Sequence, residues 1–361
     1  MHFESVRTQR GCVSYLLGCE KTSAAIAIDP DLSQVDRYLA LAAQRGLRIR
    51  YLLDTHTHAD HFSGVRPLAK QLDAPVIMHR LSPAPFVDVR VEDGETILVG
   101  ELRLAVIHTP GHTADSISVV APGRLFTGDT LLLGATGRTD LPTGDPEALY
   151  ESLFEHLLRL DGSLLVHPAH NYKDLPPTTL DEQKATNPRL QKKERAAFVE
   201  QMRALSLQMP EHLTEALRTN QTGGKTVAQL IDEAARRVPF MSMQELRRRV
   251  ESEAPGIVVL DVREADAYAA GHVPGALHVP RGQLELRADA VFPDPTVRIL
   301  AYCEVGKIST IAAATLRSMG FLGAIALDGG IRAWKETGYP LVTGPEPGSS
   351  RGSRSHGASR S

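Results

Sequence analysis

The segment Thr55-His56-Thr57-His58-Ala59-Asp60-His61 gathers three histidines and one aspartate into seven consecutive residues. Imidazole nitrogens and carboxylate oxygens are the ligands that divalent transition metals prefer. Crowding such polar groups together costs free energy unless a cation compensates them. In an extended segment, side chains two residues apart point the same way, so His56 and His58 could converge on one ion. The segment therefore predicts a metal site in the N-terminal part of the chain.

Three later segments carry the same residue types at the ends of expected strands. They are 109–113 with His112, 126–130 with Asp129, and 167–172 with His170. Loops held by a rigid sheet are common positions for catalytic residues. One isolated histidine is more often structural, but four such clusters in this order favour a shared site. The other histidines are expected to be structural or at the surface: His2, His79, His108, His156, His167, His212, His272 and His278.

The ordered set of four clusters resembles the metallo-β-lactamase superfamily. The motifs at 137–140, 168–172 and 186–190 narrow the resemblance to its ETHE1-like persulfide dioxygenase branch, over about residues 1–235. The resemblance implies one Fe(II) per chain, held by His56, His112 and Asp129. Two histidines and one carboxylate leave open positions on iron for O2 and a persulfide, as in non-haem Fe(II) oxygenases.

The resemblance also implies the substrate, glutathione persulfide, which would be oxidised to sulfite with release of glutathione. The residues matching the family's glutathione contacts are Arg138, Asp140, Tyr172 and Arg189. A guanidinium that binds a carboxylate through two hydrogen bonds suits a tripeptide with two carboxylates. Arg138 and Asp140 fit equally well a structural turn with a local ion pair.

The number of metal ions stays open on the residues alone. His58, Asp60, His61 and His170 are expected either to surround the iron ligands or to hold a second ion. Glyoxalase-II-like thioester hydrolases use such a set to bind two metals and activate a bridging water. A dinuclear hydrolase is therefore the first alternative function.

A second chemical motif lies at Cys303, which ends an expected strand at 297–302 and precedes an expected helix at 310–319. A loop that leads into a helix N-terminus directs backbone N–H groups inward and forms an anion cradle. A cysteine in such a cradle is expected to react as a thiolate. The loop continues with Glu304, Val305, Gly306, Lys307, Ile308 and Ser309.

The surroundings of Cys303 resemble the rhodanese family over about residues 239–343. The resemblance is carried by the segments 260–263, 271–276 and 328–330, with Trp334 as a core residue. It implies that Cys303 carries a persulfide sulfur between donor and acceptor. Glu304 departs from the basic or neutral residue of many members, and its charge is expected to repel sulfite or thiosulfate. Lys307 stands where arginine is common.

The sequence thus predicts an α/β protein: a metallo-β-lactamase αββα sandwich with its C-terminal helices at 1–237, then a rhodanese-like parallel α/β domain at 238–343. Residues 344–361, rich in Gly, Ser and Arg, are expected to form a disordered tail. Expected helices cover 35–44, 63–72, 194–207, 227–237 and 243–251, with a loop at 220–224. Cys12 and Cys19 are expected to be reduced core thiols.

The expected function couples the two domains through small molecules: glutathione persulfide, O2, sulfite and thiosulfate. The net charge of −3 gives no electrostatic case for nucleic acid. No apolar run reaches the roughly 20 residues of a membrane helix, and no targeting segment is recognised at Met1–Arg7. With three scattered cysteines, a cytoplasmic setting is expected. A homo-oligomer and a non-catalytic persulfide-sensing module remain open.

Overall fold

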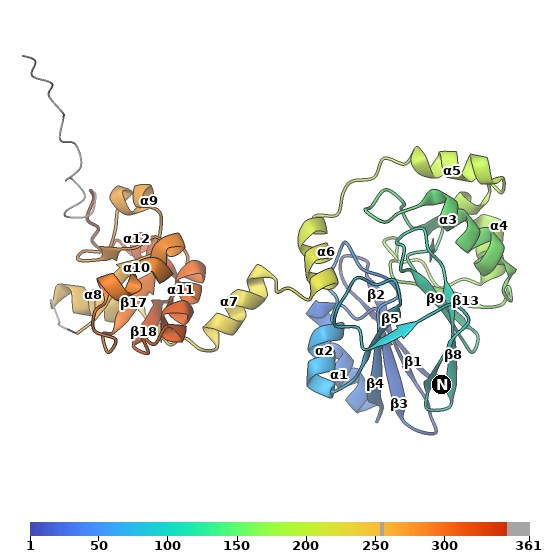
Figure 1. The fold of residues 1–361 in the computed structure, drawn as a ribbon, viewed down its shortest axis with the longest axis horizontal. Helices are drawn as coiled ribbons and strands as arrows, with labels where there is room; N and C mark the ends of the chain where they lie inside the picture. Colours follow the sequence, from blue (N-terminus) through green and yellow to red (C-terminus); the bar gives the residue numbers. More distant parts are fainter. Residues whose placement is uncertain (253–255, 345–361) are drawn as a thin grey trace, which may run out of the picture. The chain divides into compact units, whose positions relative to one another are not determined.

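The computed structural model describes residues 1–252 and 256–344. The chain forms two compact units, Met1–Gly224 and a second that begins at Lys225, and Figure 1 shows helices packed on strands in each of them. The boundary expected from the sequence follows residue 237. Helix α7 (Val227–Ala235) precedes that boundary but packs against α11 (Lys307–Ser318) of the second unit. The expected tail lies outside the described residues except for Gly344.

The first unit contains two sheets that face each other. The strands of the six-stranded sheet are in chain order: β1 (His2–Arg7), β2 (Val13–Gly18), β3 (Ala24–Ile28), β4 (Arg48–Leu53), β5 (Val76–His79) and β6 (Val89–Val91). The order in the five-stranded sheet is β13 (Leu165–Pro168), β10 (Arg124–Gly128), β9 (Ile117–Ala121), β8 (Leu102–His108) and β7 (Thr96–Val99). A two-stranded hairpin, β11 (Leu131–Leu132) and β12 (Ala135–Thr136), follows β10.

Alternation along the strands explains why both faces of each sheet are buried. In β2, Tyr15 and Leu17 belong to the core between the two sheets, whereas Leu16 belongs to the core under α1 (Val35–Gln44) and α2 (Val65–Leu72). The outer face of the second sheet is covered by α3 (Pro146–Tyr150), α4 (Leu180–Thr186) and α5 (Arg195–Arg203). Successive strand residues point to opposite faces, so a two-sided sheet needs apolar residues at nearly every position. The expected αββα sandwich is confirmed.

The second unit is built on one parallel sheet with the order β14 (Phe240–Met241), β18 (Ala324–Leu327), β17 (Ile299–Tyr302), β15 (Val258–Asp261) and β16 (Leu277–His278). Its further helices are α8 (Met243–Glu251), α9 (Ala265–Ala270), α10 (Leu284–Val291) and α12 (Gly330–Glu336). Two cores lie on its two faces, one containing Ala301 and the other Leu300. Trp334 is fully buried in the second of these cores, as expected.

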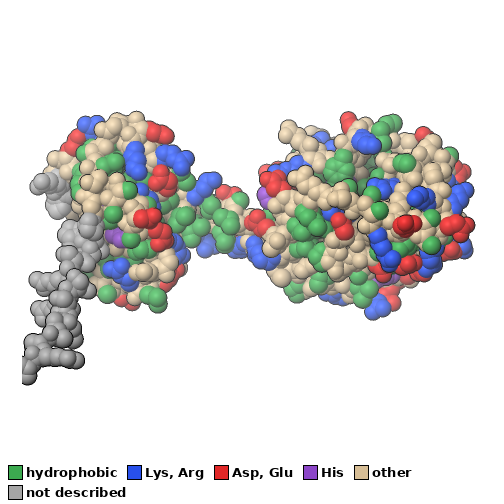
Figure 2. Space-filling view, turned by 90° about the horizontal axis from the view of Figure 1, so that it is seen from above, with side chains coloured by type: hydrophobic (Ala, Val, Ile, Leu, Met, Phe, Trp, Pro, Cys, Tyr) green, Lys and Arg blue, Asp and Glu red, His purple; other side chains and the backbone are tan. Residues whose placement is uncertain are grey.

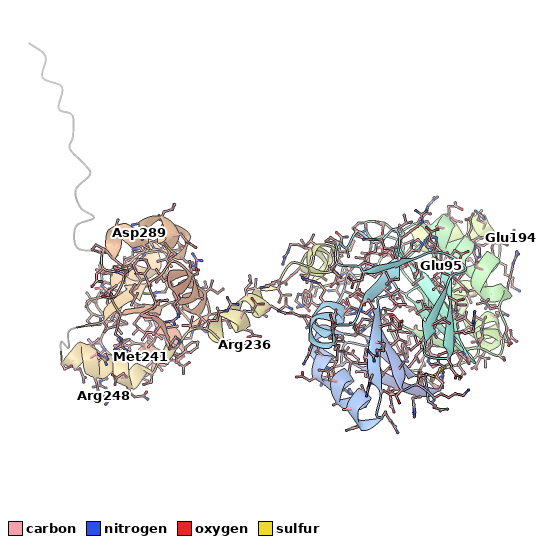
Figure 3. The ribbon with its side chains drawn as sticks, turned by 60° about the horizontal axis from the view of Figure 1, so that its bottom comes forward. Glu95, Glu194, Arg236, Met241, Arg248 and Asp289 are labelled. Atoms are coloured by element: carbon pink, nitrogen blue, oxygen red, sulfur yellow. The ribbon has the colours of Figure 1, made fainter. Side chains whose placement is uncertain are left out.

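Charged side chains of both signs are interspersed on the face drawn in Figure 2. The charged residues labelled in Figure 3 on both units, among them Glu95 and Asp289, are exposed. In the described part of the chain, no helix combines the length and hydrophobicity needed to cross a bilayer.

Several expected boundaries were wrong. Helix α6 (Leu213–Thr222) includes Asn220, which the sequence had assigned to a loop because Gly223 and Gly224 follow. Gly223 instead ends the helix in the left-handed conformation, the usual C-terminal role of glycine. The helix after Cys303 begins at Lys307 and ends at Ser318, not at 310–319. Strands β1 and β2, with their mixed polar and apolar residues, had not been recognised.

Candidate metal centre and sulfur-transfer loop

The histidine segment follows β4 and is held in place by its two threonines. Thr55 donates from its backbone N–H and its hydroxyl to the carboxylate of Asp29, at 2.7 and 2.9 Å. Thr57 donates in the same way to Asp115, at 3.3 and 2.6 Å. These bonds fix the backbone on both sides of His56 and hold the irregular segment that follows β4.

A single side chain from α6 closes the same segment. The amide of Asn220 donates to the carbonyl oxygens of His58 and His61, at 2.9 and 2.8 Å, and its oxygen accepts from the N–H of Ser63 at 3.0 Å. All three bonds are buried or part-buried, so their loss would leave unpaired polar groups. This role of Asn220 was not predicted, because nothing local to a helix end indicates a partner about 160 positions away in the sequence.

The remaining candidate ligands come from loops at the ends of strands of the second sheet. His112 follows β8, Asp129 follows β10 and His170 follows β13. Glycines allow the close approach: Gly128 has φ +49° and a Cβ there would lie 2.5 Å from Thr55 Oγ1. Gly137 lies so near Asp129 that a Cβ would be 1.9 Å from its carbonyl oxygen.

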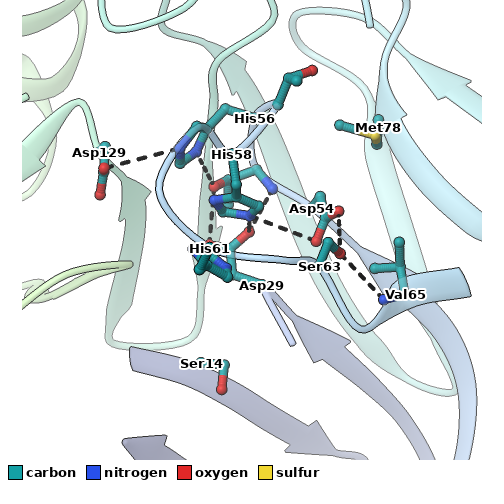
Figure 4. A network of polar contacts seen from close by, with 12 residues as sticks. Ser14, Asp29, Asp54, His56, His58, His61, Ser63, Val65, Met78 and Asp129 are labelled. Carbon is teal, nitrogen blue, oxygen red and sulfur yellow. Dashed lines mark hydrogen bonds and ion pairs between the residues drawn. The ribbon is translucent and has the colours of Figure 1, made fainter. Parts of the chain in front are cut away.

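His56, His112 and Asp129 form a compact buried group whose ligand atoms lie within 4.8 Å of one another. Oδ2 of the aspartate lies 3.9 Å from Nε2 of His56 and 3.6 Å from Nε2 of His112. Figure 4 shows the first of these contacts as a dashed line. Both distances are too long for a hydrogen bond. An ion about 2 Å from each atom fits between them.

The two Nδ1 atoms are engaged on the outer side of this group. Nδ1 of His112 lies 2.8 Å from the carbonyl oxygen of Arg138, to which it would donate. Nδ1 of His56 lies 3.0 Å from the hydroxyl of Thr55, which in turn donates to Asp29. Fixing Nδ1–H in this way leaves Nε2 free to bind a metal, as is usual for metal-binding histidines. Burial, and then His58, lowers the pKa of His56 well below its usual range, which keeps the ring neutral as a ligand must be.

His58 has a different environment from His56. Its Nε2 lies 3.3 Å from Asp29 Oδ1 and 3.7 Å from Asp54 Oδ1, contacts drawn in Figure 4. Burial alone would lower the pKa of His58, but the two carboxylates raise it well above its usual range. Within the described part of the chain, neither ring nitrogen of His58 makes a hydrogen bond, and its ring centroid lies 4.2 Å from that of His56. The two carboxylates are what distinguishes the surroundings of His58 from those of His56.

Asp60, His61 and His170 lie on another side of Asp129. Nδ1 of His170 is 2.7 Å from Asp129 Oδ1, and His61 Nδ1 is 3.1 Å from Asp60 Oδ1. Burial opposes ionisation of Asp129, but His170 and then the other nearby histidines lower the pKa of its carboxyl group, which stays charged. Cys12 also lies here, against His61 and His170. Cys12 is free and buried, as expected, and its contact with these two histidines was not predicted from the sequence.

The candidate substrate residues are only partly assembled. Arg138 donates to both oxygens of Asp140 at 2.6 and 2.7 Å and to the carbonyl oxygen of Gln208 at 2.8 Å. The ring of Tyr172 stacks on His170, with 5.2 Å between the ring centroids. For Arg189, no hydrogen bond or ion pair of the guanidinium occurs among the residues that the structure describes.

In the second unit, Cys303 lies at the end of β17 with its side chain buried. The N–H of Ser309 points at its sulfur, with an N···S distance of 3.4 Å. The loop is fixed mainly by its backbone: Cys303 O and Glu304 O accept from Ile331 N and Arg332 N, at 2.8 and 2.9 Å. Gly306, at φ +87°, turns the chain into α11. The result is a cradle at the N-terminus of a helix of twelve residues.

Two arginine side chains lie close to Glu304 at the opening of this cradle. Its Oε2 lies 3.5 Å from Nη1 of Arg263 and its Oε1 lies 3.8 Å from Nε of Arg332. Arg263 is itself bound by Asp261 at 2.6 Å. The acidic residue is thus placed among opposite charges, which the sequence did not indicate.

Comparison with known proteins agrees with both units. Residues 7–170 match the model of the metallo-beta-lactamase superfamily, and residues 242–337 match that of the rhodanese-like domain. The mitochondrial persulfide dioxygenase ETHE1 of Bos taurus is 37% identical over 214 residues, covering 58% of this chain and 84% of the relative.

The chain belongs to the ETHE1 persulfide dioxygenase family. The crystal structure of ETHE1 from Myxococcus xanthus matches with a TM-score of 0.61 and 38% identity, covering 62% of this chain and 100% of the other. A hydroxyacylglutathione hydrolase of Anaeromyxobacter dehalogenans is 39% identical over 173 residues, covering 48% of this chain and 66% of the relative. In this member of the ETHE1 family, the dioxygenase-like unit is joined to a rhodanese-like domain.

Proposed function

We propose that the protein oxidises glutathione persulfide with O2 at one Fe(II) and transfers sulfane sulfur at Cys303. In the first reaction, glutathione persulfide, O2 and water give glutathione and sulfite. In the second, thiosulfate and glutathione give glutathione persulfide and sulfite, or the reverse. The persulfide is common to both reactions. Because the two sites lie in one chain, the persulfide made at one site has a raised effective concentration at the other. The setting would be sulfide and thiosulfate metabolism in the cytoplasm, which suits the three free cysteines.

The observation that supports the dioxygenase proposal is the compact buried group of His56, His112 and Asp129, together with the two carboxylates beside His58. Two neutral imidazoles and one carboxylate would hold Fe(II) and leave positions open for a persulfide sulfur and O2. His58, the further ligand that a dinuclear site would use, lies 3.3 Å from Asp29 and 3.7 Å from Asp54, and these nearby carboxylates favour the three-ligand set.

The chain's own residues would then position the substrate. Tyr172, stacked on His170 and largely exposed, offers an aromatic surface at the edge of the cluster. Arg138 would bind a glutathione carboxylate only after loosening from Asp140 or by adding a contact, because its donors are already engaged. The contacts of Arg138 and Tyr172 therefore support substrate binding less directly than the group of His56, His112 and Asp129 supports metal binding.

The test is metal analysis of protein purified without oxygen, combined with O2 uptake on addition of glutathione persulfide. We expect about one iron per chain and stoichiometric sulfite. His56→Ala should abolish O2 uptake and leave sulfur transfer intact. Two zinc ions per chain without O2 uptake would overturn the dioxygenase proposal. Loss of both activities would argue against separable units.

A dinuclear thioester hydrolase remains the second candidate because a hydroxyacylglutathione hydrolase shares 39% identity with the first unit. It requires a second ion next to Asp129 and a bridging water. Hydrolysis of a glutathione thioester by the doubly loaded protein would favour it. A persulfide sensor without catalysis would show neither reaction and would only accumulate persulfide at Cys303.

A further inference from the structure

The turn between β1 and β2 carries an exposed arginine next to the metal cluster. The N–H of Gly11 donates to Thr8 O at 3.2 Å and the N–H of Thr8 donates to Cys12 O at 3.0 Å, which fixes the backbone of the turn. Arg10 lies at its tip and is exposed. Its guanidinium makes no hydrogen bond or ion pair with any residue that the structure describes. The turn therefore presents five N–H donors that are available to a ligand.

A cavity of about 370 Å³ adjoins this turn. Arg10 and Gln9 line it from the turn, and Tyr172 and Asp174 line it from the loop after β13. Protein sites for small molecules usually measure about 300–1,000 Å³. The cavity is therefore large enough for one end of a small polar ligand.

The charges that line the cavity favour an anion. Arg7 and Asp174 form an ion pair with each other, so their charges largely offset. Among the described lining residues, Arg10 is the remaining charged side chain. A guanidinium can bind a carboxylate through two parallel hydrogen bonds, which gives it a preference for this group over a neutral one. The cavity thus suits a ligand that carries a carboxylate.

Tyr172 connects this cavity to the candidate iron site. Its ring stacks on that of His170, with 5.2 Å between the centroids, and Nδ1 of His170 lies 2.7 Å from Oδ1 of Asp129. Gly11, at φ +86°, lets the turn lie against the tyrosine, because a Cβ there would be 2.9 Å from its Cδ1. An extended tripeptide spans roughly 10 Å. Glutathione can therefore keep its sulfur near Asp129 while one of its ends reaches the cavity.

Arg138, the other candidate partner for a carboxylate, is less available than Arg10. Its Nε and Nη2 donate to Asp140, and its Nη1 donates to Gln208 O. A carboxylate that binds Arg138 has to compete with these partners, whereas one that binds Arg10 displaces no contact between described residues. Because glutathione has two carboxylates, binding at one arginine does not exclude binding at the other.

We propose that Arg10 binds one carboxylate of the glutathione moiety in this cavity and so contributes to the choice of persulfide. The proposal rests on the proposed function, because it takes glutathione persulfide as the substrate. It adds a residue that the family resemblance did not imply. Arg10 holds the substrate away from the reacting sulfur, so its contribution is to binding and not to the oxidation step.

The first test measures O2 uptake by the iron-loaded full chain over a range of glutathione persulfide concentrations. Arg10→Gln should raise KM about tenfold, the low end for a charge-assisted contact because the guanidinium is exposed, and leave kcat and iron content unchanged. Arg10→Lys, which keeps the charge, should recover most of the loss. Arg48→Gln is the matched control. It changes an exposed arginine at the end of β4 opposite to the histidine segment and should keep the wild-type KM.

The second test measures binding without turnover. S-methylglutathione, which has no persulfide sulfur to oxidise, is titrated into the metal-free full chain by calorimetry. Arg10→Gln should weaken its binding about tenfold. The same variant should leave the affinity for the diethyl ester, which lacks both carboxylate charges, unchanged. The effect of Arg10→Gln should shrink as ionic strength rises.

The two tests separate this proposal from the proposed function. Equal affinities of wild type and Arg10→Gln for S-methylglutathione, or a fall in kcat without a rise in KM, would overturn the role of Arg10 and leave the dioxygenase proposal standing. Absence of O2 uptake in the wild type would instead overturn the proposed function. In that case, the calorimetric comparison still decides whether Arg10 binds a glutathione carboxylate.

Discussion

The metal cluster of the first unit and the cysteine cradle of the second are built in opposite ways. The cluster is formed by buried histidine and aspartate side chains from loops after β4, β8, β10 and β13, and each is oriented by another side chain or a carbonyl group. The cradle uses one reactive side chain, Cys303, and is otherwise shaped by backbone groups. The first should therefore be sensitive to changes in charge and polar contacts, and the second to changes in backbone space.

The largest effect is expected from Asp129→Asn. The amide keeps the shape of the side chain but removes its negative charge. That charge accepts the hydrogen bond from His170 Nδ1 and faces Nε2 of His56 and Nε2 of His112. Iron content and O2 uptake should fall by more than the roughly 10–100-fold that loss of a supporting partner costs. Iron content and sulfur transfer are measured on the same sample. Asp161→Asn, an exposed acid of the same unit, is the control. Retention of iron by Asp129→Asn would contradict the ligand assignment.

The second largest effect is expected from Gly330→Ala, which tests whether the cradle around Cys303 is sensitive to crowding of its backbone. A Cβ at this position, with φ +65°, would lie 2.6 Å from Cys303 O and 2.7 Å from Gly306 N. The loop must shift, and a displacement near 1 Å of a reacting group can cost about 100-fold in rate. Sulfur transfer should fall by about that factor while O2 uptake stays.

Gly338→Ala is the matched control for this change. It has a similar backbone, φ +71°, but a Cβ would have nothing within 4 Å. It should lose only the roughly 1–2 kcal/mol of stability that left-handed backbone costs a residue with a side chain. Equal losses of sulfur transfer in both variants would show that strain, rather than crowding of the cradle, causes the effect.

The same contrast explains what the sequence could predict. The clusters that contain His56, His112 and Asp129 were visible in the sequence because histidines and aspartates gather after apolar strands, and the family resemblance implied that these three bind the metal. The division between His56 and His58 was not apparent from spacing, because it depends on Asp29 and Asp54, which meet the ring only in the folded chain. Such a division is a property of the tertiary structure.

Other features were hidden for the same reason. Cys12 was expected only to be a reduced core thiol, and its bridge to His170 in the folded chain is what brings it to the cluster. Residues 260–263 marked the second unit by resemblance, but the ion pairs of Glu304 with Arg263 and Arg332 need the loop geometry. Strands β1 and β2 were missed because neither six-residue segment shows a regular alternation of polar and apolar side chains.

A smaller effect, about tenfold, is expected from Asn220→Ala. The change removes the three bonds that hold the carbonyl and N–H groups of the histidine segment and leaves those groups buried. Loss of a supporting partner typically costs about 10–100-fold in metal affinity, and the low end applies because the threonine anchors remain. Iron affinity is measured by competition with a chelator. Gln221→Ala, the next residue of α6, should leave the affinity unchanged. Equal affinities in wild type and Asn220→Ala would show that the threonines suffice.

The smallest effect is expected from Glu304→Gln, the one charge change predicted to alter the cradle. The carboxylate lies among the guanidinium groups of Arg263 and Arg332 and offsets their charge toward an incoming anion. Removing one negative charge at about 5–8 Å from a doubly charged donor at high dielectric should raise kcat/KM for thiosulfate by about threefold to tenfold. The gain should shrink as ionic strength rises, because exposed charges are screened over about 8–10 Å. Glu336→Gln, an exposed acid farther along α12, is the control. If kcat/KM for thiosulfate is unchanged or lower in Glu304→Gln, the carboxylate positions the two arginines for the anion instead of masking them, and side chains shape this cradle as they do the metal cluster.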